Sequence, residues 1–232
     1  MPEEAGLESE YERGERVRMV REQLAGRNIR DPRVLSAMGS LPRRLFIPEE
    51  LRDRAYIDGP LPIGEGQTIS QPYIVAFMTQ LLELKGFERV LEVGTGSGYQ
   101  AALLGRLARE VFYIERIEPL AVQARIALEV LEICNVHIII GDGSRGLPEY
   151  APYDAIILTA AAPRIPGILV EQLAENGRLV APVGGSGGQF LQLVQRRGTR
   201  LIRRRLVPVA FVPLRGEYGW SDEEWWAETG SP

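Results

Sequence analysis

The sequence predicts an α/β protein with a mostly parallel, doubly wound sheet and an antiparallel C-terminal hairpin strand. Two observations support this prediction. Between residues 72 and 184, apolar strands alternate with amphipathic helices, a pattern typical of a parallel sheet covered on both faces. After residue 188, two strands are joined by a short glycine-containing turn, which predicts an antiparallel hairpin at the sheet edge.

Length and composition agree with one domain. The 232 residues suffice for one sizeable core, and 45% hydrophobic and 25% charged residues are usual for a globular protein. We expect a single domain over 1–232. It would consist of N-terminal helices and a substrate and cofactor loop (1–75), a core (76–195) and a C-terminal strand and tail (196–232).

Several classes of protein and site are disfavoured. No stretch approaches the roughly 20 apolar residues that span a bilayer, and the acidic N-terminus is unlike a signal peptide, so we expect a cytoplasmic protein with no membrane partner. Cys134 is the only cysteine, so we expect no disulfide and no cysteine-based metal site. Its place in the apolar run EICNVHIII predicts a buried thiol, and we expect no metal. The net charge of −4 argues against a nucleic-acid partner. We expect a monomer.

The elements follow in order along the chain. A surface helix is expected over the first 30 residues, with apolar positions from Val17 to Ile29. Asp31 and Pro32 predict the N-cap and first residue of a second helix. In residues 54–72 the apolar positions follow neither the period of a helix nor that of a strand, and glycines and prolines are frequent. We therefore expect a long ordered loop there, of the kind that often binds ligands.

The core then alternates helices and strands. We expect helices at 72–84, 97–109, 119–131 and 168–173, and strands at 89–94, 111–115, 136–141, 153–159 and 177–184. The segment 196–205 holds six arginines in ten residues. We interpret it as the solvated side of a hairpin around Gly198, with a phosphate-binding patch as the alternative.

The strongest local signal is LEVGTGSG, in which Gly94, Gly96 and Gly98 follow a strand and open a helix. Glycine lets the backbone approach a ligand closely, and the helix N-terminus offers unpaired amides. The spacing differs from the G-x-G-x-x-G of dinucleotide folds, which disfavours a pyrophosphate ligand. A tight turn without a ligand is the alternative.

Acidic residues end the next two strands. Glu115 is placed to accept the hydroxyls of a ribose, and Asp142, followed by Gly143, the amino group of adenine. A solvated strand-end glutamate is the alternative. Because the carboxyl ends of parallel strands share one sheet edge, these positions together predict an adenosine-containing cofactor.

The acceptor is expected to be a carboxylate. Residues 159–163 lack the Asn-Pro-Pro-aromatic tetrapeptide of enzymes that methylate amides and exocyclic amines. The only histidine, His137, lies in an apolar strand at the wrong end of the sheet and is expected to be structural. A carboxylate is already ionised near pH 7 and needs no base, only alignment in a dry site.

The segment GQTISQP supplies amides and hydroxyls for such a site. Ser70 is expected at the start of the helix that runs from Pro72. There its hydroxyl can cap the amide of Tyr73 or donate to a substrate carboxylate, and the two roles are compatible.

As a set, these residues resemble the protein-L-isoaspartate (D-aspartate) O-methyltransferases. The match runs from about Asp31 to Leu214, and its most specific blocks are AYIDGPLPIGEGQTISQPYIVAFM, VLEVGTGSGYQAALL, GDGSRGLPEYAPYDAIILTAAAP and GRLVAPVG. The resemblance implies a Rossmann-like methyltransferase fold with S-adenosyl-L-methionine as donor and S-adenosyl-L-homocysteine as product. It implies repair of damaged proteins and peptides by methylation of L-isoaspartyl carboxylates, with D-aspartyl residues as a second acceptor to be tested.

The resemblance also implies roles for individual residues. Ser70 matches the active-site serine of the family. The implied cofactor contacts are Gln67, Thr68, Ile69, Ser70, Glu92, Gly94, Thr95, Gly96, Ser97, Gly98, Glu115, Arg116, Asp142 and Gly143. The implied substrate contacts are Leu61, Pro62, Ile63, Val212 and Leu214. The chain departs from the family in a longer N-terminal extension and in the tail WSDEEWW.

Three other functions stay open at this point. A methyltransferase of the same fold acting on a small molecule or on RNA would use the arginine-rich hairpin to bind phosphate. An NAD-dependent oxidoreductase would place a nicotinamide cofactor at the glycine turn. A silent adenosine-binding module would bind cofactor and methylate nothing.

Overall fold

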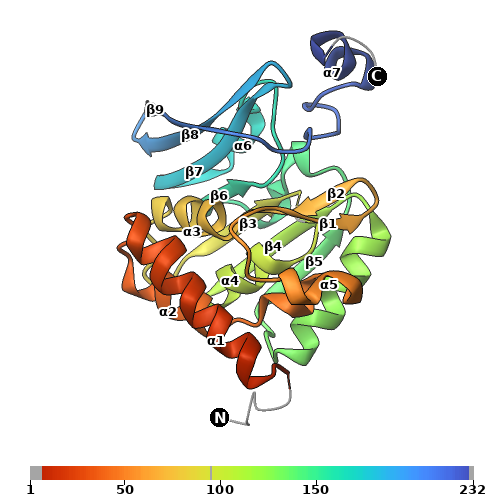
Figure 1. Cartoon of the computed structure of the whole chain (residues 1–232). Helices are drawn as coiled ribbons and strands as arrows, with labels where there is room; N and C mark the ends of the chain where they lie inside the picture. Colours follow the sequence, from red (N-terminus) through yellow and green to blue (C-terminus); the bar gives the residue numbers. More distant parts are fainter. Residues whose placement is uncertain (1–6, 95, 230–232) are drawn as a thin grey trace.

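The computed structural model describes residues 7–94 and 96–229. Thr95, one of the expected cofactor contacts, lies outside the described residues. The chain forms one central sheet with helices packed against it, and the last strands extend the sheet beyond the helical layer (Figure 1).

The central sheet has seven strands in the order β5-β4-β3-β6-β7-β8-β9. Strands β3 to β7 pair in parallel, whereas β7, β8 and β9 pair antiparallel. The strand order reverses direction between β3 and β6, and ligands of open α/β sheets bind at the carboxyl ends of the strands beside such a reversal. The strands are β3 (Arg89–Val93), β4 (Glu110–Glu115), β5 (Val136–Ile140), β6 (Tyr153–Leu158), β7 (Leu173–Gly185), β8 (Gly188–Arg197) and β9 (Arg200–Val209).

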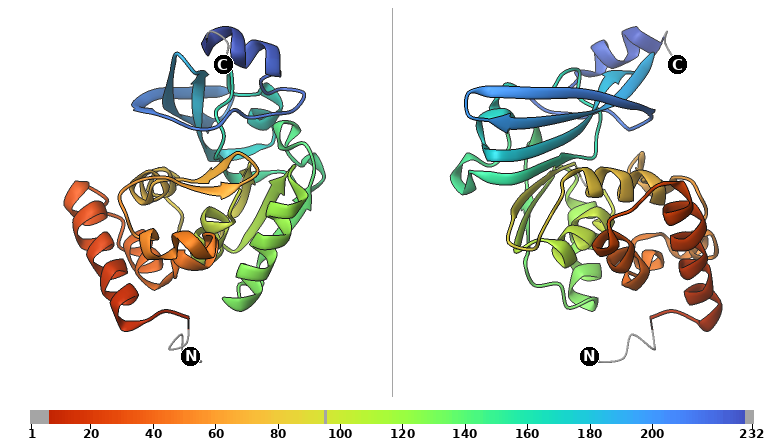
Figure 2. Two further views of the ribbon diagram at one scale, coloured as in Figure 1. Left: turned by 45° about the vertical axis from the view of Figure 1, so that its right-hand side comes forward. Right: turned by 90° about the vertical axis from the view of Figure 1, so that its left-hand side faces the viewer.

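The helices form the outer layers of the molecule, as the two views in Figure 2 show. They are α1 (Glu10–Arg18), α2 (Pro32–Ser40), α3 (Pro72–Leu81), α4 (Tyr99–Leu107), α5 (Glu118–Val130), α6 (Gly167–Glu171) and α7 (Asp222–Thr229). Helix α2 begins as expected, because the Asp31 carboxylate accepts hydrogen bonds from the amides of Arg33 and Val34. Together with the strand pairing, this arrangement confirms the predicted fold class.

The apolar core lies on both faces of the sheet. On one face, residues of α2, α3 and α4 pack with Val90, Val111 and Leu193. On the other face, residues of α6 pack with Leu91, Phe112 and neighbouring strands. Burial on both faces explains why the central strands read as continuous apolar runs in the sequence.

The N-terminal helix differs from the expected pattern. The α1 helix ends at Arg18 and continues as a π-helical segment, Met19–Leu24. A π turn holds more residues than an α turn, so it shifts the buried face. As a result Val17 is 55% exposed, and Met19 is fully buried in its place.

The expected loop at 54–72 contains a β-hairpin, so the prediction of no regular structure was wrong. Strand β1 (Leu61–Gly64) pairs antiparallel with β2 (Gln67–Ile69). The strands have four and three residues, too few to show a period of two in the sequence. The connection bends at Glu65 and Gly66, both of which have positive φ angles.

The expected buried thiol at Cys134 is also wrong. Cys134 is exposed, because it lies in the turn between α5 and β5 rather than in the apolar strand, which begins at Val136. His137 lies on β5 with its ring stacked on Phe112 and its Nε2 3.2 Å from a carboxylate oxygen of Glu110. Glu110 begins β4, so His137 is at the end of the sheet opposite the glycine turn, as expected.

Candidate active site

The glycine turn that follows β3 has a backbone that only glycine adopts readily. Gly94, Gly96 and Gly98 have φ angles of 79°, 58° and 82°. A Cβ on Gly98 would lie 2.6 Å from the Cβ of Ala124 on α5, so this glycine also permits close packing of two helices. The turn therefore brings the N-terminus of α4 to the carboxyl edge of the sheet.

Glu115 lies directly under this turn. Its carboxylate oxygens accept hydrogen bonds from the amide of Gly96 at 2.9 Å and from the amide of Ile117 at 2.8 Å. The residue is 4% exposed. The carboxylate of Glu115, which the sequence predicts as a cofactor contact, thus also holds the glycine turn in place. The neighbouring Arg116 is exposed to solvent.

Asp142 is bound to the C-terminal segment. Its oxygens accept hydrogen bonds from the hydroxyl of Ser144 at 2.7 Å and the amide of Glu217 at 2.8 Å. Burial raises the pKa of Asp142, but the hydrogen bonds from Glu217 and Ser144 and the charge of Arg145 outweigh it, so the pKa lies below its ordinary value. Gly143 beside it lines a cavity.

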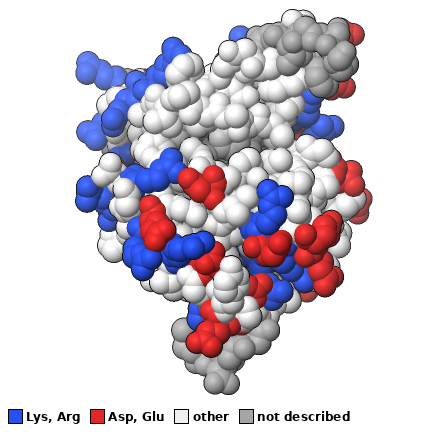
Figure 3. Space-filling view, viewed as in Figure 1, with Lys and Arg blue, Asp and Glu red and all other residues white. Residues whose placement is uncertain are grey.

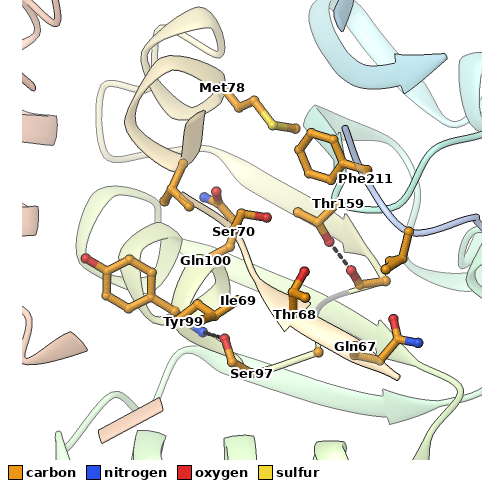
Figure 4. Close-up of a pocket in the computed structure, with 14 residues that line it drawn as sticks. Gln67, Thr68, Ile69, Ser70, Met78, Ser97, Tyr99, Gln100, Thr159 and Phe211 are labelled. Carbon is orange, nitrogen blue, oxygen red and sulfur yellow. Dashed lines mark hydrogen bonds between the residues drawn. The ribbon is translucent and has the colours of Figure 1, made fainter. Parts of the chain in front are cut away.

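Two adjoining cavities lie on either side of the glycine turn. Both are lined by Gln67 of β2, by Gly94 and Gly96, and by Val212. The first cavity continues under the β1–β2 hairpin and α3, and Figure 4 shows the side chains that line it. The second continues along the ends of β4 and β5. The first is also lined by Thr68, Ile69, Ser70, Val75, Met78, Ser97, Tyr99, Gln100, Thr159 and Phe211, and the second by Glu115, Arg116, Gly141, Gly143 and Leu214.

A third cavity, of about 420 Å³, opens to the surface beside the first. Its wall is formed by Pro60, by the N-terminus of α3 and by the segment after β9. Five residues line both this cavity and the first one, and in Figure 4 four of them surround one space. They are Thr68, Ser70, Thr159, Phe211 and Val212.

Comparison with known proteins identifies this architecture. A sequence model of the family described as Protein-L-isoaspartate(D-aspartate) O-methyltransferase (PCMT) matches residues 15–219. The chain belongs to this family. Membership confirms the expected enzyme class, an S-adenosylmethionine-dependent methyltransferase, and sets aside the NAD-dependent oxidoreductase.

Individual relatives agree over most of their length. A protein-L-isoaspartate O-methyltransferase from Methanoregula boonei is 56% identical over 208 residues, which cover 90% of this chain and 96% of the relative. One from Halorhodospira halophila is 57% identical over 192 residues, covering 82% and 87%. A Plasmodium falciparum protein of this name, solved in complex with S-adenosyl-L-homocysteine, has a TM-score of 0.75 at 30% identity and covers 86% of this chain and 98% of its own.

The residues at the two adjoining cavities suit the cofactor of the PCMT family. S-adenosylmethionine carries ribose hydroxyls, an amino acid group and a sulfonium. A buried carboxylate at Glu115 matches the hydroxyls, and the lack of a Cβ at Gly94, Gly96 and Gly98 leaves backbone groups open to a close ligand. Among the described residues, no group of three or more His, Cys, Asp and Glu is placed to hold a metal ion.

Ser70 does not cap α3, so of its two possible roles the capping one is wrong. The N-cap of α3 is Gln71, and its side chain makes no capping bond. The Ser70 hydroxyl is left without an intramolecular partner among the described residues and lies where the first and third cavities meet. It is therefore available to a ligand.

Some of the other expected site residues that the structure describes line at least one of the three cavities, and the others line none of them. Leu61 and Ile63 are buried in the core, Glu92 is buried in β3, and none of the three lines these cavities. Pro62 is exposed, and Leu214 lines the cavity beside Glu115 rather than the surface opening. Ser97 lines the first cavity, where its hydroxyl accepts a hydrogen bond from the amide of Tyr99.

Several lining residues were not predicted. Thr159 follows β6, and its hydroxyl donates to the carbonyl oxygen of Gly94. The rule that parallel strands end at one edge would have found it. Gln100 and Phe211 gave no signal, because Gln100 is held by the hydroxyl of Thr79 and Phe211 is brought in by the turn after β9, both of which are tertiary contacts.

Proposed function

We propose that this protein transfers the methyl group of S-adenosylmethionine to the free carboxylate of L-isoaspartyl residues in proteins and peptides, with Ser70 as the catalytic residue. The observation that carries the proposal is the shared wall between the first cavity and the surface opening. A donor in one and an acceptor in the other would be separated only by the groups of that wall.

The role of Ser70 follows from the chemistry of the acceptor. A carboxylate is a nucleophile near neutral pH, so the residues need to align it and exclude water rather than remove a proton. The hydroxyl of Ser70 donates a hydrogen bond that orients the substrate carboxylate. Phe211 and Val212 keep the approach apolar, which strengthens attraction between an anionic oxygen and a cationic donor.

S-adenosylmethionine, when bound, supplies an electrophilic methyl group. We assign its contacts to the glycine turn, to Gln67 and Ser97, and to Glu115 and Gly143, which both line the second cavity. The methyl ester that leaves the enzyme then cyclises to a succinimide without further catalysis, and hydrolysis returns part of it to the normal aspartyl linkage.

The surroundings of the enzyme are a separate part of the proposal. We infer a cytoplasmic, monomeric protein of one domain that binds no nucleic acid. An exposed free thiol at Cys134 suits a reducing compartment. No helix in the described part of the chain has the length and apolar character to cross a membrane. Gel filtration tests the monomer.

The deciding experiment compares two peptides that differ only in one linkage. One carries an aspartyl residue and the other an isoaspartyl residue at the same position, and methanol release after base treatment measures methyl esters. We expect methylation of the isoaspartyl peptide alone. Equal labelling of both peptides, or of neither, would refute the acceptor. A D-aspartyl peptide run in parallel decides the second acceptor.

A further inference from the structure

The arginines of the β8–β9 hairpin differ from many other arginines of the chain. Ten arginines elsewhere form ion pairs with carboxylates. Among the described residues, none of the six arginines between 196 and 205 does so. Figure 3 shows the basic side chains gathered over this hairpin, and the strand from 200 to 205 is exposed throughout. This positive patch is uncompensated in a chain whose net charge is −4.

Strand β9 is also an open edge. It ends the sheet, and within the described residues no strand pairs with its outer side. An open edge offers alternating amides and carbonyls to an extended peptide, which can add to the sheet as a further strand. Arginine side chains along the edge would favour a negatively charged peptide over a neutral or positively charged one.

The hairpin presents its arginines on two faces. Arg204 lies opposite Leu193, and Arg200 lies opposite Arg197. Leu193 packs in the same core cluster as Met78 of α3, so Arg197, Arg200 and Arg204 share the α3 face of the sheet. That is also the face of the surface opening, which Ile74 of α3 lines.

The other arginines of the hairpin have different surroundings. Arg205 packs over the ring of Phe190 at 3.3 Å, and Arg196 donates to the carbonyl oxygen of Leu173. Arg203 lines a separate surface cavity together with Glu171 and Glu224. The free positive charge on the α3 face therefore rests on Arg197, Arg200 and Arg204, of which Arg200 and Arg204 lie on the edge strand β9.

The strand leads directly into the surface opening. Pro208 and Val209 end β9 and line the opening together with Ser70. At about 3.3 Å per residue, an extended peptide that runs beside β9 from Pro208 at the opening needs roughly four residues to reach Arg204 and roughly eight to reach Arg200. One continuous surface thus connects the acceptor position with the positive patch.

We propose that the open edge of β9, with Arg200 and Arg204, binds an acidic, extended segment that flanks the isoaspartyl residue of the substrate. The proposal rests on the proposed function and names a substrate class for it. Flexible segments suit this surface, because their backbone groups are unpaired and they are rich in charged residues. A peptide fits better than a nucleic acid, since the ring of Phe190 is already covered by Arg205 and no exposed aromatic ring of the hairpin is left for a base.

The test uses three peptides of equal length with a central isoaspartyl residue. The first carries glutamates about four to about eight residues on the N-terminal side, the second carries them on the C-terminal side, and the third carries glutamines at both. A peptide that adds to β9 runs in one direction along it, so only one of the two acidic peptides can place its glutamates beside the arginines. We expect that peptide to have a kcat/KM about three- to tenfold above that of the glutamine peptide, because its KM is lower. The preference should shrink as salt is raised.

The variant Arg200→Gln/Arg204→Gln should lose this preference while keeping the wild-type kcat on the glutamine peptide. Arg18→Gln/Arg21→Gln on the N-terminal helical segment makes the same charge change away from the opening and should keep the preference. Circular dichroism checks that both variants are folded.

The outcomes separate the two proposals. If wild type methylates none of the peptides, the proposed function fails. If it methylates all three equally, or if the hairpin variant keeps the preference, the acidic-flank proposal is overturned and the function stands. Equal peptide rates combined with salt-dependent binding of single-stranded DNA, lost in the hairpin variant, would assign the patch to nucleic acid and overturn it as well.

Discussion

Nη2 of Arg43 donates a hydrogen bond of 2.8 Å to the carbonyl oxygen of Ser70. Arg43 is fully buried, and its Nε donates to the carbonyl oxygen of Ala55 at 2.9 Å. Its guanidinium lies 5.0 Å from the ring centre of Tyr99, which lines the first cavity. Burial lowers the pKa of Arg43 to about 10, so the group stays charged at neutral pH. A buried cation thus holds the backbone of Ser70, the residue that we propose as catalytic.

The first prediction concerns this contact. Arg43→Lys should lower the free energy of unfolding by about 1–3 kcal/mol, because one ammonium cannot serve both carbonyl oxygens in the fork geometry of arginine. It should also lower kcat more than it raises KM, because Ser70 is displaced without removing a substrate contact. Urea unfolding and initial rates measure the two effects. The neighbouring Arg44→Lys is the control, since Arg44 is paired with Glu12 and should leave kcat unchanged.

The second prediction concerns the serine itself. Ser70→Ala should lower kcat about 10²-fold, the usual loss for one donor that acts on a charged reacting group. Calorimetry with S-adenosylhomocysteine should show a much smaller loss of affinity, because Ser70 is only one of many residues that line the first cavity. Full turnover on an isoaspartyl peptide would remove Ser70 from the mechanism.

The third prediction concerns Asp142 and pH. Because its folded pKa lies below the ordinary value of 3.8, Asp142 stabilises the fold fully above that value, and the stabilisation disappears as pH falls through the folded pKa. Asp142→Asn should therefore be less stable than wild type at pH 7, and the difference should vanish in strong acid. Denaturant unfolding across this range measures it. Asp53→Asn, at an exposed position in another segment, is the control.

The fourth prediction concerns the glycine turn. Gly98→Ala should lower the free energy of unfolding by about 2–5 kcal/mol, because the new Cβ would meet Ala124 at 2.6 Å in a left-handed backbone. Gly14→Ala is the matched control. Gly14 is exposed in α1 with no atom near its Cβ position, so alanine should raise stability by roughly 0.5–1 kcal/mol. Equal effects of the two substitutions would contradict this account.

The parts of the site that the sequence predicted depend on local spacing. The glycine turn after β3 and Glu115 at the end of β4 follow from the alternation of strands and helices, which brings strand ends together. The β8–β9 hairpin around Gly198 was also predicted from local sequence, namely from the short glycine-containing turn between two strands. These features need no knowledge of distant contacts.

The parts that the sequence did not predict depend on contacts between distant segments. Arg43 has nothing in its neighbourhood that marks it as buried, because its partners Ala55 and Ser70 are 12 and 27 residues away. The π-helical segment exchanges Val17 for Met19 in the core, which an α-helical period cannot reveal. The hairpin of β1 and β2 is too short to leave a pattern.

Val212 borders all three cavities, whereas Pro208 and Val209 border only the outer one. Strand β9 and its exit can therefore vary in sequence, and so change which polypeptides are recognised, without disturbing the machinery that holds the methyl donor. At Phe211 and Val212 this freedom ends, because both residues also line an inner cavity that we assign to the donor. We therefore expect substrate range and donor affinity to be separable along the chain as far as Phe211.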